Sequence, residues 1–174
     1  MEATTVEIWN AVGTWVAGIG TISAVITSLW LARNVNEVKL KIKASSRILI
    51  DPSITDHPEL CYIEIVNIGN KVAKITTIGW KIERGKEKKE FYQNTNGSRS
   101  EKTPFTLDEG MDATITIDFN GKSNWLTTMA EHTKGFNVDD LKLIVVTSIK
   151  TFEIKIDKNL AKVIKEERKR LSKD

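Results

Sequence analysis

The sequence predicts a mainly β protein that begins with a transmembrane helix and continues as an antiparallel β-sandwich of seven or eight strands. Three observations predict this fold. Residues 8–32 carry no charged side chain. After residue 38, apolar side chains recur at every second position, which is typical of half-buried strands. Turn-forming residues separate these runs, as they do in all-β sandwiches and barrels.

The apolar stretch is long enough to cross a membrane. Ile8 to Ala32 is a run of 25 uncharged residues, and as a helix it would be roughly 37 Å long. The hydrocarbon core of a bilayer is about 30 Å thick. Trp9 and Trp30 lie near its two ends, where aromatic rings favour the headgroup boundary. The hydroxyl side chains within the stretch can bond to the helix backbone, so they cost less than charges would.

Two other interpretations fit this stretch less well. A signal peptide needs a basic N-terminal region, whereas Glu2 and Glu7 precede this stretch and no Lys or Arg does. A buried helix of a soluble protein is normally shorter and has one charged face. The transmembrane interpretation is therefore favoured.

The flanking charges predict the orientation of the helix. Cations follow it closely in the sequence, at Arg33, Lys39, Lys41, Lys43 and Arg47. Because positive residues stay on the cytoplasmic side, we expect residues 1–7 to be an extracytoplasmic tail and the rest to be cytoplasmic. This assigns a single-pass chain to the inner (cytoplasmic) membrane, with 33–37 as the juxtamembrane linker and Trp9, Trp30 and Arg33 at the membrane interface.

One face of the predicted helix carries only small residues. They are spaced by four, three, four and four positions: Gly13, Ala17, Gly20, Ala24 and Ser28. Small side chains at this spacing let two membrane helices approach closely, which predicts a homo-oligomer. The alternative is that Gly and Ala are simply common in membrane helices.

The segment 38–157 is predicted to form the sandwich. The expected strands cover 38–43, 48–50, 61–65, 72–75, 78–82, 113–119, 141–149 and 151–156, with the last two as a hairpin about Lys150. A short helix from Ser123 to Lys134 is expected to bury Trp125, Leu126 and Met129 and to end at Gly135. A basic helix is expected over 158–174.

The phrase IEIVNIGNKVAKITTIGWKI resembles the strand–Asn-x-Gly–strand signature of immunoglobulin-like modules. With the predicted anchor and the final LIVVTSIKTFEIKI hairpin, the chain resembles small, uncharacterised single-pass membrane proteins of bacteria and their phages. The resemblance covers most of the chain and implies an immunoglobulin-like sandwich on a membrane stalk. It implies no catalytic residue.

The residues suited to catalysis or metal binding do not form a recognisable motif. His57 lies in a turn-forming stretch, His132 lies near a helix end, and Cys61 shares a strand face with apolar residues. No nucleophile, phosphate-loop or paired-cysteine motif occurs. We therefore expect a protein that is not an enzyme and that needs no metal or cofactor.

The C-terminal helix carries cations that could contact lipid or an anionic ligand: Lys162, Lys165, Arg168, Lys169 and Arg170. It also carries a narrow apolar stripe, which favours a solvated helix docked on the domain. No aromatic side chain lies among these cations, which disfavours binding of nucleic acid.

The leading hypothesis is a membrane-anchored, self-associating interaction module at the cytoplasmic face, which binds a protein or a small ligand without chemistry of its own. The alternative is an oligomerising membrane effector of the phage-defence type. In that alternative, the soluble domain senses an anionic ligand such as a nucleotide, and the helices perturb the bilayer.

Overall fold

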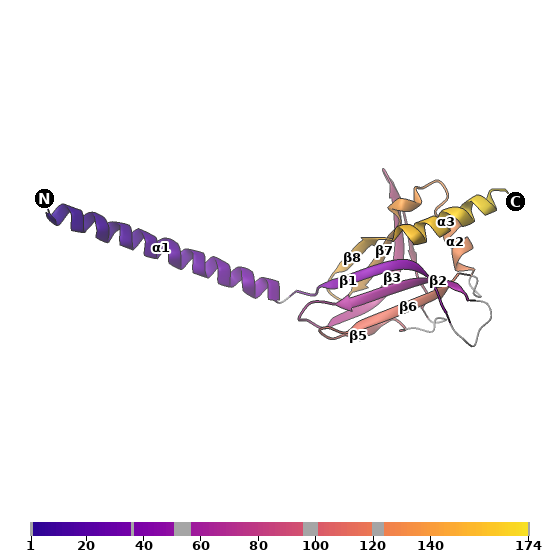
Figure 1. Cartoon of the computed structure of the whole chain (residues 1–174), viewed down its shortest axis with the longest axis horizontal. Coiled ribbons are helices and arrows are strands. Elements are labelled where there is room, and N and C mark those ends of the chain that lie inside the picture. Colours follow the sequence, from indigo (N-terminus) through magenta and orange to yellow (C-terminus); the bar gives the residue numbers. More distant parts are fainter. Residues whose placement is uncertain (1, 36, 51–56, 96–100, 120–123, 174) are drawn as a thin grey trace. The chain divides into compact units, whose positions relative to one another are not determined.

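The computed structural model describes residues 2–35, 37–50, 57–95, 101–119 and 124–173. The chain divides into two compact units, Met1–Glu37 and Val38–Asp174, and each is described by itself (Figure 1). The first unit is one helix. The second contains the sheets, two further helices and the core.

The first unit is helix α1, Glu2–Val35, which is longer than the expected 8–32. Its stretch Thr4–Arg33 is long and apolar enough to cross a membrane, the one helix with that property among the described residues. No part of this span is buried inside the protein. A core helix of a soluble domain would instead be covered by its own chain.

The second unit contains eight strands within the described residues, and every pairing between them is antiparallel. The strands are β1 Leu40–Ile48, β2 Glu59–Asn67, β3 Ala73–Arg84, β4 Glu87–Tyr92, β5 Phe105–Leu107, β6 Asp112–Asp118, β7 Lys142–Thr147 and β8 Thr151–Lys155. One sheet has the order β1-β2-β6. The other has the order β4-β3-β7-β8, with β5 also paired to β3.

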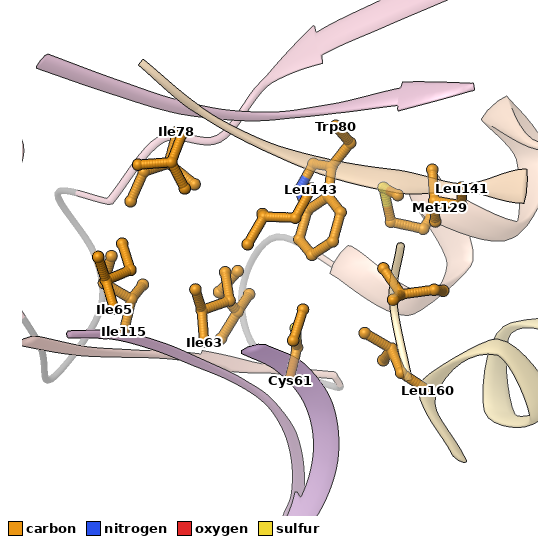
Figure 2. Close-up of a cluster of buried hydrophobic side chains, with 14 of the residues drawn as sticks. Cys61, Ile63, Ile65, Ile78, Trp80, Ile115, Met129, Leu141, Leu143 and Leu160 are labelled. Carbon is orange, nitrogen blue, oxygen red and sulfur yellow. The ribbon is translucent and has the colours of Figure 1, made fainter. Parts of the chain in front are cut away.

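The two sheets contribute to one hydrophobic core. In Figure 2, Cys61, Ile63, Ile65 and Ile115 of the first sheet lie opposite Ile78, Trp80 and Leu143 of the second. These side chains occupy alternate strand positions, as the period of two requires. Trp80 packs against Trp125 with ring centroids 5.4 Å apart, and both indole N–H groups donate to the Gln93 side-chain oxygen.

Two helices extend this core. Helix α2, Trp125–His132, buries Trp125 and Met129, while Leu126 is only half-buried. It is shorter than expected, and Ser123, the first residue of the predicted helix, lies outside the described residues. Gly135 follows it with a φ of 88°, which suits a residue without a side chain. A short 3-10 turn, η1 Val138–Asp140, leads into β7, and α3 spans Lys158–Leu171.

The described residues contain eight strands, within the predicted seven or eight, but the eight predicted segments fall on only six of them. The stretches 38–43 and 48–50 were expected as separate strands, yet β1 runs through Ala44 and stays paired with β2 over its whole length. The stretches 72–75 and 78–82 are likewise one strand, β3, interrupted by a bulge between Ile75 and Thr77. Strands β4 and β5 were not predicted.

Candidate functional site

The small-residue face of α1 is open in the single chain. Gly13, Ala17, Gly20, Ala24 and Ser28 are all exposed. A Cβ atom added at Gly13 or Gly20 would meet nothing within 4 Å. This face therefore has room for the close approach of another helix, and self-association through it stays a prediction.

Three hydroxyl groups of α1 are hydrogen-bonded to the backbone of the helix itself. The side chains of Thr14, Thr21 and Thr27 donate to the carbonyl oxygens of the residues four positions earlier, at 2.8–2.9 Å. A hydroxyl with such a bond is cheaper to place in lipid than a free one. Trp9 and Trp30 lie exposed near the two ends of the span, and Arg33 is its last residue.

Helix α3 docks on the domain through a narrow apolar stripe. Leu160, Ala161 and Ile164 are buried in the common core. Asn159 fastens the start of the helix to β1, because its side-chain amide donates to the Ser46 carbonyl and its oxygen accepts from the Ser46 N–H. The helix is therefore part of the folded domain.

Most of the cations predicted to contact a ligand already have partners in the protein. Lys165 bonds both carboxylate oxygens of Asp139 at 2.7 Å. Arg168 donates to the backbone carbonyls of Thr133 and Phe136. These contacts connect α3 to the loop after α2. Lys165 and Arg168 therefore help to hold α3 in place, a role that the sequence did not reveal.

The other cations of α3 have weaker attachments. Arg170 pairs with Glu167 at 2.7 Å, and Lys162 approaches Glu166 at 3.8 Å. Hydrogen bonds from Arg170 and from Thr127 lower the pKa of the Glu167 carboxyl. Lys169 is exposed. The five predicted cations therefore do not form one free basic surface.

The structure reveals a hollow that the sequence analysis missed, on the outer face of the five-stranded sheet. Its volume is about 220 Å³, and its lining residues are Gly79, Glu90, Phe91, Tyr92, Ile144, Val146, Thr151 and Glu153. Register places Tyr92, Gly79, Ile144 and Glu153 side by side across four strands. Because Gly79 has no side chain, the sheet is open at its floor.

Gly79 also has a structural reason to be glycine. A Cβ atom there would lie 2.6 Å from the Phe91 carbonyl oxygen, so the residue allows β4 to approach β3 closely. Tyr92 stands beside it with 78% of its surface exposed. A glycine within an alternating strand was the sequence signal that could have indicated this site.

An ion-pair network borders the hollow. Lys81 lies 2.8 Å from Glu153, and Lys142 lies 2.8 Å from Glu83, with longer cross-contacts of 3.4 Å. Hydrogen bonds to the lysines lower the pKa values of both glutamates, and the same bonds raise the pKa values of both lysines. The network at the border of the hollow thus contains two cations and two anions, and their charges cancel.

The remaining candidates for chemistry do not come together. Cys61 is fully buried, and burial raises the pKa of its thiol well above the usual range. The His132 ring stacks on Phe91 with centroids 5.0 Å apart, and His57 is exposed. Among the described residues, no three His, Cys, Asp or Glu side chains are grouped to hold a metal ion.

Comparisons with known proteins identify no family. No family model matches the chain, and no curated protein matches it. Among solved structures, the chain is similar to the X-ray structure of the Northeast Structural Genomics Consortium target SoR45, with 14% identity over 70% of this chain and 83% of that one. The TM-score is 0.30, so this likeness carries no argument about fold or function.

Proposed function

We propose that this protein is a membrane-anchored, non-enzymatic interaction module that self-associates through α1 and presents its domain at the cytoplasmic face. The observation that carries the proposal is the contrast between the two units. Every side chain described in the span of α1 is exposed, while the domain closes around a core of its own. A helix that is apolar on all sides and uncovered by its own chain suits lipid.

We further propose that the domain is an immunoglobulin-like sandwich. Its two strand orders, β1-β2-β6 and β4-β3-β7-β8, correspond to the orders A-B-E and C′-C-F-G of such modules. Immunoglobulin domains also bury a tryptophan on strand C, and the strand proposed as its counterpart, β3, carries the buried Trp80. Cys61 lies on the equivalent of strand B, although no disulfide partner faces it among the described residues.

The hollow beside Gly79 is the proposed partner site. Pockets for drug-sized ligands are typically about 300–1,000 Å³, whereas this hollow is about 220 Å³. Its size therefore favours one inserted side chain of a protein partner. Tyr92 and Ile144 supply apolar contact area, and the ion-pair network supplies a polar border. This arrangement of apolar centre and polar rim is typical of protein interfaces.

Photocrosslinking in cells tests the partner site. A photoreactive phenylalanine analogue at Tyr92 is expected to form a discrete adduct with a second protein. The control places the same analogue at Tyr62, which lies on the outer face of the other sheet. No adduct from position 92, or the same adducts from both positions, would contradict the proposed face.

Self-association is tested with two matched substitutions in α1. Gly20→Leu fills the small-residue face, whereas Gly18→Leu adds the same side chain off that face, at a position with equal free space. Energy transfer between labelled chains in liposomes should fall for Gly20→Leu and persist for Gly18→Leu. Equal transfer in both variants and in the unsubstituted chain would exclude this face as the contact.

The membrane-effector alternative predicts a different consequence of the same variants. An effector should release a small dye from expressing cells, and Gly20→Leu should abolish the release. The interaction module should leave permeability unchanged at high expression. The involvement of Lys165 and Arg168 in contacts within the domain favours the module, because fewer cations remain for an anionic signal.

A further inference from the structure

One end of the domain carries a cluster of exposed apolar side chains at its loop tips. They come from three connections, those of β2–β3, β5–β6 and β7–β8: Ile68, Val72, Met111 and Ile149, all more than half exposed. These tips belong to one end of the fold. The Asn67 N–H donates to the Met111 carbonyl, and the Ser148 N–H donates to the Lys74 carbonyl.

The same end is where the chain enters from α1. Strand β1 begins at Leu40, and the Ile68 N–H donates to the carbonyl of Lys39 just before it. Only four residues separate Val35, the last of α1, from Leu40. An extended chain of this length spans at most about 18 Å. The length of this connection limits how far the first residue of β1 can lie from the last residue of α1.

The β2–β3 loop is held in place by a buried polar side chain, Asn67. The Asn67 amide donates to the carbonyls of Lys71 and Leu107, and its oxygen accepts from the Gly69 N–H. This fixes the β2–β3 loop against the end of β5. Such internal satisfaction of backbone groups lowers the cost of placing a loop against lipid, because fewer groups lose bonds to water.

The β7–β8 turn is built in the same manner. The Thr147 hydroxyl oxygen accepts from the N–H groups of Ile149 and Lys150 and donates to the Lys150 carbonyl. The turn therefore presents Ile149, 73% exposed, at its tip. The described residues of the domain leave most of its surface uncovered, although burying an isoleucine would be favourable by about 1.5–3 kcal/mol.

We propose that this end of the domain docks on the bilayer, with the four apolar tips inserted at the headgroup boundary. The inference rests on the proposed membrane anchorage of α1. The charges near the tips are nearly matched in number: Lys39, Lys71, Lys74 and Lys150 against Asp108, Glu109 and Asp112. The attraction is therefore mainly apolar, and it does not require anionic lipid.

Two other apolar side chains are exposed at the opposite end of the domain. Ile48 ends β1 and Ile50 follows it. A nine-residue strand is about 30 Å long, which places these residues one strand length from the tethered end. Ile48 and Ile50 provide an internal comparison, because we propose that only the opposite end, where β1 begins, docks on the bilayer.

The test uses the full-length chain in liposomes, with a fluorophore on single introduced cysteines. Asn70→Cys and Ser148→Cys report on the tips, and Lys86→Cys in the β3–β4 turn is the control. All three positions are exposed, whereas the native Cys61 is buried, so we expect it not to react with the fluorophore in the folded chain. Dissolved iodide and a headgroup spin-labelled lipid serve as quenchers.

We expect positions 70 and 148 to lose quenching by iodide and to gain quenching by the labelled lipid, while position 86 does the opposite. Adding Met111→Ser and Ile149→Ser should restore iodide quenching at position 70. The pattern should be the same in phosphatidylcholine liposomes with and without phosphatidylglycerol. Protection that appears only with phosphatidylglycerol would contradict apolar insertion.

Two other results would overturn the inference. Equal iodide quenching at positions 70 and 86 would show that the tips face water. Protection that grows with protein density, without quenching by the labelled lipid, would show that a second copy of the chain covers them. If instead alkaline carbonate extracts the chain from the liposomes, the anchorage itself fails. A carbonate-resistant chain with iodide-accessible tips refutes only the docking.

Discussion

Helices α1 and α3 have opposite compositions and opposite surroundings. Helix α1 is apolar over its span, yet its own chain covers none of that span. Helix α3 is rich in charge, yet it buries Leu160, Ala161 and Ile164 in the domain core. The comparison shows that a helix docks through the geometry of a narrow stripe. The total hydrophobicity of a helix instead indicates whether lipid or water is its more favourable environment.

The largest expected difference comes from the same substitution in both helices. Ile164→Ala in α3 removes buried methyl groups and should lower the free energy of unfolding of the domain by about 2–5 kcal/mol. Ile22→Ala in α1 should leave it unchanged, because Ile22 is 62% exposed. Urea unfolding of the detergent-solubilised chain, followed by circular dichroism, measures both. An equal loss of unfolding free energy in both variants would contradict the view that α3 is part of the domain core and α1 is not.

A charge in the middle of α1 is expected to affect insertion and not folding. Ile19→Lys should disfavour membrane insertion by about 3 kcal/mol on the translocon scale. The fraction of chain resistant to alkaline carbonate measures this effect, with Ile19→Leu as the control. If the lysine variant stays fully in the membrane fraction, α1 does not lie across the hydrocarbon core.

Within α3, two neighbouring cations should behave differently. Arg168→Ala removes hydrogen bonds to the Thr133 and Phe136 carbonyls and should lower the free energy of unfolding by about 1–2 kcal/mol. Lys169→Ala removes an exposed side chain and should change it by less than about 0.5 kcal/mol. Urea midpoints compare the two variants. Equal effects would mean that Arg168 does not fasten α3 to the loop.

The smallest expected effect is the pH dependence of the ion-pair network. Because the pKa of Glu153 is lowered by Lys81, its contribution is present above the unfolded pKa of about 4.3 and is lost as pH falls through the lower folded value. Glu153→Gln should therefore lose less stability than the unsubstituted chain between pH 6 and pH 3.

The matched control for this network is Glu131→Gln, on an exposed position of α2. It should keep the full acid sensitivity of the unsubstituted chain. The difference should shrink in high salt, since the network is largely exposed to solvent. An identical pH profile for Glu153→Gln and the unsubstituted chain would exclude a role for the network in stability.

Periodic patterns in the sequence predicted the strands that bury a full face. Cys61, Ile63 and Ile65 alternate in β2 as expected, and the same holds for β6 and β7. Strand β4 was missed because it is an edge strand: five of its six residues are exposed, so no apolar period marks it. Strand β5 has only three residues. Propensity alone cannot distinguish such strands from loops.

The candidate sites were predictable to different degrees. The candidate membrane span in α1 could be predicted from composition, because an uncharged run of that length is typical of a transmembrane helix. The hollow depends on Tyr92, Gly79, Ile144 and Glu153 meeting across four strands, and no local pattern encodes that register. The cations of α3 were predicted as a group, but their partners Asp139, Thr133 and Phe136 are distant in sequence.

Membrane topology is the most direct test of the account, because the proposed anchorage, self-association and docking on the bilayer all depend on α1 lying in the membrane. The decisive measurement is protease digestion of carbonate-washed membranes and of intact spheroplasts that express the full-length chain. The account predicts that the chain stays in the membrane pellet and that the domain is digested only after lysis. Chain in the supernatant, or a domain digested in intact spheroplasts, would contradict it.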